Sequence, residues 1–234
     1  MPLKFFEKID STNEYVKENL LYFKENFSGV YTFNQLQGKG QRENSWLCEP
    51  QKNIALTFCL ANSSIPPLSV SFWVAIVVRN FIEKITHLST SIKWPNDILI
   101  KRKKICGILI EKSKGTFIIG IGINVLQTDF SDLDLLRASS LSLLTSKSYS
   151  LSSLVNHLLI NFKENYSLLD HSEYLYKTYN NYLFGKNLIM SFKIKNSIVK
   201  GRIKGVDEDG LLLLELENKL IEKFKIKEIE FLYE

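Results

Sequence analysis

Apolar and polar positions along the first 183 residues predict short strands and a few longer helices. Apolar side chains near helical spacing predict an amphipathic helix from Ser11 to about Asn26. Val30–Asn34 and Asn53–Leu60 have the apolar and β-branched content of strands. Ser69 to about Ile85 is apolar on most sides, which predicts a largely buried helix.

The stretch from residue 91 to residue 125 has the clearest strand pattern in the chain. A turn at Trp94–Asp97 follows the first short strand, and the basic turn Lys101–Lys104 closes a hairpin. The predicted strands are Ser91–Lys93, Ile98–Ile100, Ile105–Glu111 and Thr116–Val125. A polar, serine-rich loop at 126–150 and helices at Ser152–Leu169 and Glu173–Leu183 complete this region.

After Phe184-Gly185 the pattern changes to short strands with turns such as Asp209-Gly210 between them. These strands are predicted at Leu188–Lys195, Ser197–Val206, Leu211–Leu216 and Leu220–Lys225. Four to five strands in about 50 residues predict a small β-barrel. We therefore expect an α+β protein, in which residues 1–183 form a mixed β-sheet flanked by helices and residues 184–234 form a small all-β domain.

The amino-acid composition and net charge limit which classes of protein fit the sequence. The 234 residues are 45% hydrophobic, so the chain can bury a core, and the net charge of +5 suits an anionic ligand or an acidic partner. No basic cluster indicates nucleic-acid binding, and the three cysteines have no metal-ligand spacing. The start of the chain has no signal-peptide pattern, and the longest apolar run, Val70–Val78, is too short to span a bilayer. We expect a soluble cytoplasmic protein without a nucleic-acid or membrane partner.

Ser11-Thr12-Asn13-Glu14 opens the first predicted helix and has two interpretations. Ser-x-x-Glu is a capping box, which satisfies the free backbone donors at a helix start. The hydroxyl and amide side chains can also hydrogen-bond a polar head group such as a cyclic urea. The two interpretations are compatible, because a cap places these side chains at the positive end of the helix dipole.

The polar loop Gln35–Trp46 contains Gly38-Lys39-Gly40, two cations and an aromatic side chain. Gly-x-Gly allows the close backbone approach that a phosphate-binding loop needs, although an ordinary turn fits equally well. The loop is not a Walker loop, because no Gly-Lys-Ser/Thr follows at the required spacing.

Lys93-Trp94-Pro95-Asn96-Asp97, followed by Lys104–Glu111, is a more specific pattern. A rigid turn that presents an amide and a carboxylate beside ammonium groups fits an anionic ligand and a metal ion. For three of the four cations in Lys101–Lys104 we expect only a solvated turn. Gly120-Ile121-Gly122-Ile123-Asn124 lies in an apolar strand, where the glycines allow either close packing or contact with a flat ligand. The chain has no Ser/His/Asp, Cys/His or zinc pattern.

In their order along the chain, these segments resemble the catalytic domain of biotin–protein ligases, in the short form that lacks an N-terminal DNA-binding domain. The matching residues are Ser11–Asn13, Gln35, Gly38–Gln41 through Trp46, Lys93–Asp97, Lys104–Glu111 and Gly120–Asn124, with a weaker match at Ala138–Leu141. The tail resembles the small SH3-like C-terminal domain of this family. Five motifs in the right order are hard to obtain by chance.

The resemblance implies a reaction that uses ATP, Mg²⁺ and biotin. The carboxylate of biotin would attack the α-phosphate of Mg-ATP to give biotinyl-5′-AMP and pyrophosphate. A lysine of a biotin carboxyl carrier domain, from acetyl-CoA carboxylase or a similar protein, would then take the acyl group. Such a reaction needs cations, donors and positioning but no protein nucleophile. The enzyme would act as a monomer or a homodimer.

By position, the resemblance also implies residue roles. The biotin-binding residues would be Ser11, Thr12, Asn13, Gln35, Gly38, Lys39, Gly40, Gln41 and Lys104. The nucleotide-binding residues would be Arg42, Trp46, Lys93, Asn96 and Asn124. The catalytic residues would be Lys104, at the junction of carboxylate and α-phosphate, with Arg42 and Asp97. Arg42 and Trp46 would belong to a loop that orders over the adenylate, while the Mg²⁺ ligands stay unassigned.

The chain departs from the family pattern in the same loop. Lys39 and Gln41 stand where arginine is usual or frequent, and Glu43 stands where glycine is common. Lysine keeps the charge but not the bidentate fork, so weaker retention of the adenylate is expected. Because the match begins within about ten residues of Met1, we expect no helix-turn-helix domain and no operator binding.

Two alternatives stay open from the sequence. A lipoate–protein ligase has a similar fold, but its own glycine-rich motif and His-Asp pair are not found. The other alternative is a basic binding module, whose barrel would offer cations to nucleic acid. Those cations are Lys193, Lys195, Lys200, Arg202 and Lys204. The same segment has many acidic residues and no stacked aromatic ladder. Pyrophosphate release on mixing with ATP and biotin separates these alternatives from a biotin ligase.

Overall fold

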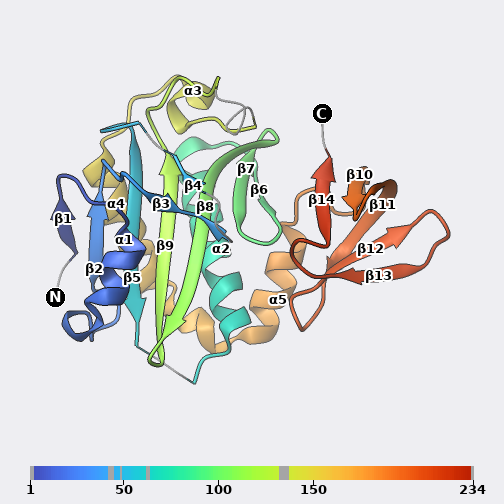
Figure 1. Cartoon of the computed structure of the whole chain (residues 1–234), viewed down its shortest axis with the longest axis horizontal. Helices are drawn as coiled ribbons and strands as arrows, with labels where there is room; N and C mark the ends of the chain where they lie inside the picture. Colours follow the sequence, from blue (N-terminus) through green and yellow to red (C-terminus); the bar gives the residue numbers. More distant parts are fainter. Residues whose placement is uncertain (1–2, 42–44, 48, 62–63, 132–136, 233–234) are drawn as a thin grey trace.

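A seven-stranded sheet, here called the main sheet, forms the larger part of the structure (Figure 1). The structure is a computed structural model that describes residues 3–41, 45–47, 49–61, 64–131 and 137–232. The strand order is β1-β2-β5-β9-β8-β7-β6, in which β1 and β2 are parallel and all other neighbours are antiparallel. The strands are β1 (Lys4–Phe6), β2 (Gly29–Thr32), β5 (Asn53–Leu60), β6 (Thr90–Lys93), β7 (Asp97–Ile100), β8 (Lys103–Ser113) and β9 (Thr116–Asn124).

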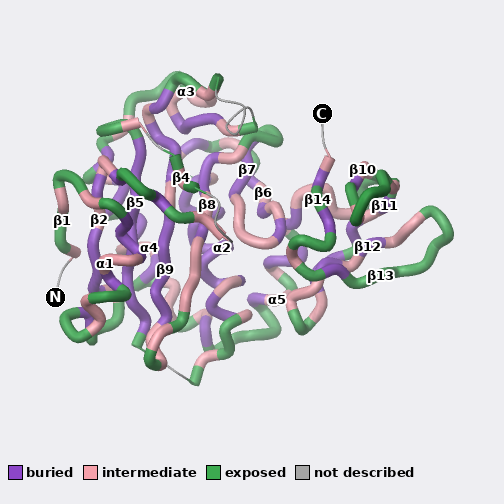
Figure 2. Tube along the Cα trace, viewed as in Figure 1, coloured by how far each residue is buried: buried purple, intermediate pink, exposed green. Residues whose placement is uncertain are grey.

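Helices cover the main sheet, and a short ribbon crosses in front of it (Figure 1). The helices are α1 (Thr12–Glu18), η1 (Leu20–Tyr22), α2 (Pro67–Thr86), α3 (Leu141–Thr145), α4 (Leu151–Glu164), η4 (Tyr166–Asp170) and α5 (Ser172–Asn181). The ribbon consists of β3 (Gly38–Lys39) and β4 (Ser45–Trp46). Every residue of β5 is buried, so this strand lies in the interior of the main sheet and is covered on both faces (Figure 2).

Side-chain alternation along β5 assigns its residues to two different faces of the main sheet. Leu56 and Phe58 belong to the large core, which also contains the buried side chains of α2 and α4. Cys59 points the other way and packs with Val16 of α1 and Phe23 in a smaller cluster. The helix α1 therefore lies on the face opposite to α2 and α4, and its first turn faces the middle strands of the sheet.

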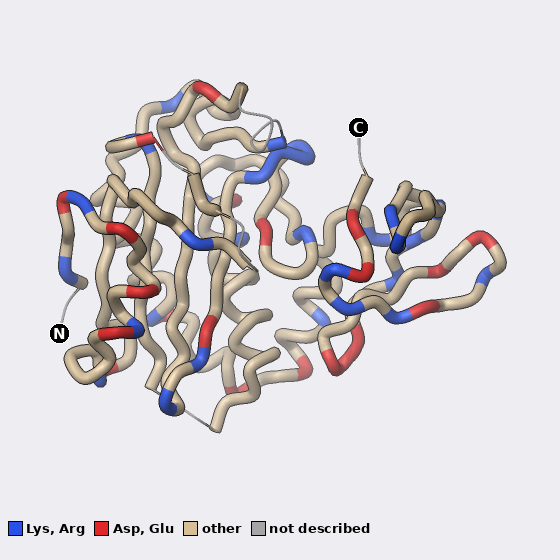
Figure 3. The backbone as a smooth tube through the Cα atoms, in the orientation of Figure 1, with Lys and Arg blue, Asp and Glu red and all other residues tan. Residues whose placement is uncertain are grey.

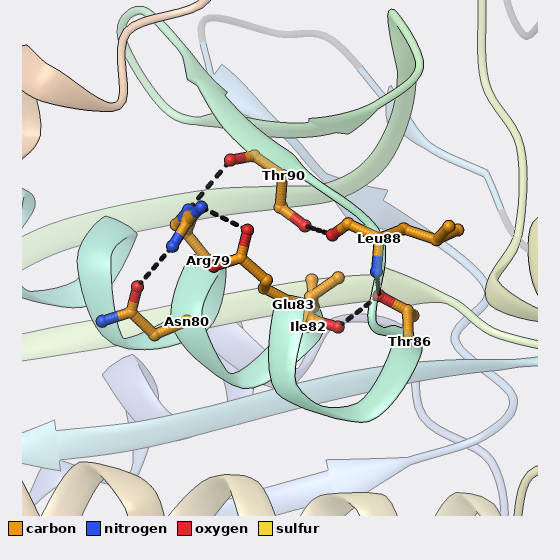
Figure 4. A network of polar contacts seen from close by, with 7 residues as sticks. All are labelled: Arg79, Asn80, Ile82, Glu83, Thr86, Leu88 and Thr90. Atoms are coloured by element: carbon orange, nitrogen blue, oxygen red, sulfur yellow. Dashed lines mark hydrogen bonds and ion pairs between the residues drawn. The ribbon is translucent and has the colours of Figure 1, made fainter.

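A buried arginine ties α2 to the edge of the main sheet (Figure 4). Arg79 is 5% exposed, and its Nε donates to the carbonyl of Thr90 at 2.8 Å. Its guanidinium also donates to Asn80 and Glu83, and it lies 3.7 Å from the centroid of the Tyr182 ring. Because each of the three guanidinium nitrogens donates to a partner, the site stabilises the packing of α2 beside β6.

The C-terminal residues form a second, five-stranded sheet with the order β13-β12-β11-β10-β14. Its strands are β10 (Ile189–Ile194), β11 (Ser197–Val206), β12 (Leu212–Leu216), β13 (Ile221–Phe224) and β14 (Ile229–Leu232). All pairings are antiparallel, and no ladder joins the edge strands β13 and β14 within residues 184–232. The predicted α+β class, a mixed sheet flanked by helices with a small β-domain after it, is confirmed. The strands of the predicted small β-barrel form a five-stranded antiparallel sheet that no ladder closes within residues 184–232.

The two sheets are joined by specific contacts. The Trp94 indole Nε1 donates to the carbonyl of Gly210 at 3.1 Å. The Asn180 amide at the end of α5 pairs with both backbone groups of Val206, at 2.7 and 3.1 Å. The boundary at residue 183 stays a prediction, because it concerns the folding of each part alone. No helix among the described residues is long and apolar enough to cross a membrane.

Removing the Arg79 guanidinium tests whether this buried charge stabilises the fold. We expect Arg79→Ala to lower the free energy of unfolding by about 3 kcal/mol, because Glu83 and the Thr90 carbonyl lose their partner. Arg79→Lys should recover only part of this loss, since lysine has neither the planar fork nor the stacking face. Urea unfolding measures both, with the exposed Lys84→Ala in the same helix as the control. A loss below about 0.5 kcal/mol for Arg79→Ala would contradict the assignment.

Candidate active site

A cavity of about 510 Å³ opens on the α1 side of the main sheet and is closed by residues of the C-terminal sheet. It brings together most of the side chains predicted from sequence. Those in its lining are Ser11, Thr12, Asn13, Gln35, Lys39, Gly40, Gln41, Trp46, Lys93, Asn96, Asp97 and Lys104. Gly38 and Asn124 are not in the described lining, and Arg42 lies outside the described residues.

The start of α1 supplies one polar wall of the cavity. Ser11 is the N-cap, and its Oγ accepts from Glu14 N at 3.4 Å, as the capping interpretation predicts. The Glu14 carboxylate meets Lys39 Nζ at 3.1 Å, which links this helix to the β3 strand. Gln35 Oε1 accepts from the backbone N–H of Thr12 at 2.8 Å. The capping and ligand-facing interpretations of this segment therefore both agree with the geometry.

Behind this wall, five polar residues form a continuous series of contacts from Gln35 through Thr12, Thr57 and Asn13 to Glu111. We call this series the polar chain. Its oxygen–oxygen distances are 3.0, 2.8 and 2.7 Å, and Asn13 Nδ2 donates to Glu111 Oε2 at 3.1 Å. Thr57 and Glu111 were not predicted as site residues. In the sequence, Thr57 is only a β-branched residue of a buried strand, and Glu111 only ends a matched segment.

Glu111 is held in its ionised form by its neighbours. Burial opposes ionisation, but hydrogen bonds from Lys17 and Asn13 outweigh it, so the pKa of the Glu111 carboxyl lies below its usual value. The partner Lys17 Nζ is 2.9 Å away, and this carboxylate raises the pKa of Lys17. One end of the polar chain is therefore a fixed negative charge.

The opposite side of the cavity holds an ion pair between Lys104 Nζ and Asp97 Oδ1 at 2.7 Å. The hairpin of β7 and β8 produces it, because Asp97 pairs with Gly107 and the register shift between Ile98 and Leu99 brings Lys104 close to Asp97. Basic residues gather at the turn of this hairpin (Figure 3). The Lys104 side chain is 34% exposed, so it faces the cavity and stays accessible to a ligand.

Three hydrogen bonds hold the backbone around this ion pair. Lys104 N donates to the carbonyl of Arg137 at 2.8 Å, and Ser139 N donates to the carbonyl of Lys104 at 3.0 Å. In the preceding turn, Asn96 Nδ2 donates to the Ile108 carbonyl at 2.7 Å, which uses the amide for positioning. These bonds tie the turn to β8 and to the segment at residues 137–139.

Glycines of β9 make room for two side chains of the site. A Cβ at Gly120 would lie 2.1 Å from Asn13 Oδ1, and a Cβ at Gly122 would lie 2.4 Å from the Trp46 indole. The flat group that abuts Gly122 is therefore the protein's own indole, where a flat ligand was one expectation. Lys104 Nζ lies 5.6 Å from the centroid of the same ring. The Trp46 Nε1 is buried and has no hydrogen-bond partner among the described residues.

The C-terminal sheet contributes a wall that the sequence did not indicate. Its lining residues are Ile226, Lys227, Ile229, Glu230 and Phe231. The Phe231 ring lies 5.5 Å from Lys93 Nζ, and the Phe231 carbonyl accepts from Arg137 Nη1 at 3.4 Å. These residues carry no motif of their own, so only the three-dimensional arrangement reveals them.

The described residues contain no cluster of side chains that could bind a metal ion without a substrate. No group of three or more His, Cys, Asp or Glu side chains comes together there as ligands. Two carboxylates do line the cavity, those of Asp97 and Glu230. Both buried cysteines, Cys59 and Cys106, are free, and burial raises the pKa of each thiol, which leaves them protonated and unreactive.

Known proteins match both parts of the chain. Residues 5–127 match the biotin/lipoate A/B protein ligase family, and residues 191–232 match the biotin protein ligase C-terminal domain. The bifunctional ligase/repressor BirA of Bacillus subtilis is 32% identical over 213 residues, which cover 86% of this chain and 65% of the relative. The biotin–[acetyl-CoA-carboxylase] ligase of Mycobacterium tuberculosis is 26% identical over 100 residues, 40% of this chain and 38% of that protein. The chain thus spans less than two thirds of these relatives.

A solved structure shares the whole arrangement. The biotin protein ligase from Aquifex aeolicus in complex with biotin and ATP superposes with a TM-score of 0.83 at 24% identity. The match covers 98% of this chain and 97% of that one, so the two sheets belong to a single shared fold.

The contact between Trp46 and Gly122 can be tested by a double-mutant cycle. We expect Gly122→Ala to destabilise the protein by about 1–3 kcal/mol, because the new methyl group overlaps the indole. In a Trp46→Ala background the same substitution should cost much less, since the space is empty there. Urea unfolding of the four proteins measures the coupling. Equal costs in both backgrounds would show that the indole does not lie on Gly122.

Proposed function

The chain belongs to the biotin/lipoate A/B protein ligase family, and we propose that it is a biotin–protein ligase that activates biotin with ATP. The observation that carries this proposal is one cavity with two chemically different ends. One end is the polar wall of Ser11, Thr12 and Gln35, which suits an uncharged head group with N–H and C=O groups. The other end holds the Lys104 ammonium, which suits the carboxylate of the same ligand and a phosphate.

In the first half-reaction, a carboxylate oxygen of biotin attacks the α-phosphorus of ATP. The bond from that phosphorus to the bridging oxygen breaks, and pyrophosphate leaves with its electron pair. Both reactants are anions, so Lys104 would reduce their repulsion and stabilise the charge that develops on the α-phosphate. Asp97 would orient the Lys104 ammonium through the 2.7 Å ion pair.

The nucleotide would lie beside Lys93, Asn96 and Trp46, which line the same cavity. Arg42 is proposed to join them from the adjoining loop, on the strength of its position in the sequence. Asn124 stays a sequence-based prediction only, because it is buried at the end of β9 outside the described lining. Lys39 already has an ionic partner in Glu14, which would leave it less free to hold the adenylate.

ATP brings Mg²⁺ with it, and the cavity has oxygen ligands that fit this ion. Mg²⁺ usually binds through one or two carboxylates together with substrate phosphates. Asp97 and Glu230 are the carboxylates in the lining, and they are the residues that would hold the ion. When bound, the ion neutralises charge on the phosphates.

In the second half-reaction, the amine of a lysine attacks the acyl carbon of biotinyl-5′-AMP. An amide bond forms, the bond from that carbon to the phosphate oxygen breaks, and AMP leaves while the amine proton passes to water. The acceptor is proposed to be the lysine of a biotin carboxyl carrier domain, such as that of acetyl-CoA carboxylase. The relative from Mycobacterium tuberculosis carries that substrate in its name, which supports the choice.

A lipoate ligase is the alternative within the family. The C-terminal match to residues 191–232 is specific to the biotin protein ligase C-terminal domain, which favours biotin. Incubation with ATP, Mg²⁺, a carrier domain and either biotin or lipoate decides between them. We expect the mass of the carrier to rise by one biotinyl group and not by a lipoyl group. An unchanged carrier with biotin, or a lipoylated one, would contradict the proposal.

Replacing Lys104 tests the assigned role of its ammonium. We expect Lys104→Ala to slow biotin-dependent pyrophosphate release by about 100-fold or more, because developing charge on the α-phosphate loses its nearest cation. Lys101→Ala, in the exposed turn of the same hairpin, is the matched control and should retain its rate. An unchanged unfolding midpoint shows that the fold is intact. Near-normal turnover by Lys104→Ala would exclude the role.

A further inference from the structure

The turn between β6 and β7, residues 94–96, forms part of the cavity lining, and we call it the connecting turn. Neighbouring strands hold its two outer residues. Trp94 donates to a carbonyl of the C-terminal sheet, and Asn96 exchanges two hydrogen bonds with β8. Pro95 lies between them and has no N–H, so its carbonyl is the only polar group through which it can be held. The bond to this carbonyl therefore affects how the next strand presents Asp97.

Tyr179 of α5 holds the Pro95 carbonyl from the core side of the main sheet. Its hydroxyl donates to that carbonyl oxygen at 2.9 Å. Tyr179 is 1% exposed, and its ring packs on Phe72 of α2 with the centroids 4.3 Å apart. It is not among the described residues that line the cavity. Tyr179 therefore contacts the connecting turn from behind, without touching a ligand in the cavity.

Backbone hydrogen bonds fix the place of this hydroxyl relative to the connecting turn. Directly after α5, Ile92 N donates to the carbonyl of Tyr182, and Phe184 N donates to the carbonyl of Ile92, both at 2.8 Å. Ile92 belongs to β6 and lies two residues before Trp94. The end of α5 is thus attached to the strand that leads into the turn, and Tyr179 lies less than one helical turn before this attachment.

Asp97 links the connecting turn to the proposed chemistry, because its carboxylate lies 2.7 Å from Lys104 Nζ. Burial, and then the charge of Asp97, raise the pKa of the Tyr179 hydroxyl, which stays protonated and able to donate. Without that hydroxyl, water does not reach the buried side, and the Pro95 carbonyl has to turn toward the cavity for a donor. Such a rotation moves Asn96 and then Asp97, because the peptide unit is planar.

We infer that Tyr179 is a positioning residue for adenylate formation: its hydroxyl holds the connecting turn so that Asp97 orients the Lys104 ammonium. This inference rests on the proposed function. Groups that stabilise developing charge need a geometry fixed in advance, and a displacement of about 1 Å can cost about 100-fold in rate. Tyr179 should therefore affect the rate of activation but not the affinity for the biotin head group. A purely structural role would lower the amount of folded protein and reduce both in proportion.

The variant Tyr179→Phe removes only the hydroxyl and keeps the ring that packs on Phe72. We expect kcat for biotin-dependent pyrophosphate release to fall about tenfold, because Asp97 loses its fixed position. The Kd of biotin, measured by calorimetry without ATP, should stay within about twofold with an unchanged number of sites per protein, which also shows that the variant is folded. Tyr176→Phe is the matched control, since its ring in the same helix also packs on Phe72, and it should retain the wild-type kcat.

A double variant with Asp97→Asn tests the route from Tyr179 to the reaction. In single turnovers with enzyme in excess, we expect Tyr179→Phe to cost less than about twofold in this background, because the charge that it positions is absent. A wild-type rate for Tyr179→Phe, an equal loss for Tyr176→Phe, or an equal cost with and without the Asp97 charge would overturn the inference and leave the proposed function intact. A wild-type protein that releases no pyrophosphate with biotin and ATP would overturn both.

Discussion

The backbone of β9 has no side chain at Gly120 and Gly122 on the face that lines the cavity, and the site depends on this close approach. Asn13 lies on the first glycine and Trp46 on the second, each closer than any Cβ would allow. The Asn13 amide of α1 therefore packs on β9 at Gly120, and the Trp46 indole of the β3–β4 ribbon packs two residues further along, at Gly122. A larger side chain at either position would separate the polar chain or the indole from the rest of the cavity.

Around this surface, the two ends of the cavity achieve rigidity in different ways. The polar wall is ordered by hydrogen bonds that end on an ionised Glu111, whose charge is balanced by Lys17 outside the cavity. The cationic end is ordered by backbone pairing on both sides of Lys104 and by its contact with Asp97. Groups fixed in advance need little reorganisation when charge develops, which is what the proposed acyl and phosphoryl transfer requires of the site.

The sequence predicted the main elements because their patterns are local. β5 begins and ends where its apolar and β-branched content indicated, at Asn53 and Leu60. The first helix was predicted to be longer than it is. α1 ends at Glu18, because the next residue, Asn19, leaves helical geometry and bonds back to the Tyr15 carbonyl, and a short 3-10 turn follows. Caps of this kind depend on a single side chain and are hard to distinguish from a continuing periodic pattern.

The candidate site was predicted in part, for a physical reason. Residues with an obvious chemical type, such as Lys104 and Asp97, were identified because their motif places them in one hairpin. Thr57, Glu111 and Phe231 were missed, since their relevance arises from contacts between elements that are distant in the sequence. Asn124 shows the converse, because a polar residue at a strand end lies buried outside the described lining.

The central claim is that one cavity joins biotin to AMP before any carrier is present. Native mass spectrometry of the wild-type protein, after incubation with ATP, Mg²⁺ and biotin but no carrier, tests it most directly. The account predicts a protein species heavier by one biotinyl-5′-AMP, which appears only when both substrates are present. Separate binding of ATP and biotin without formation of that adduct would contradict the account, and so would an AMP adduct that forms only when lipoate replaces biotin in the incubation.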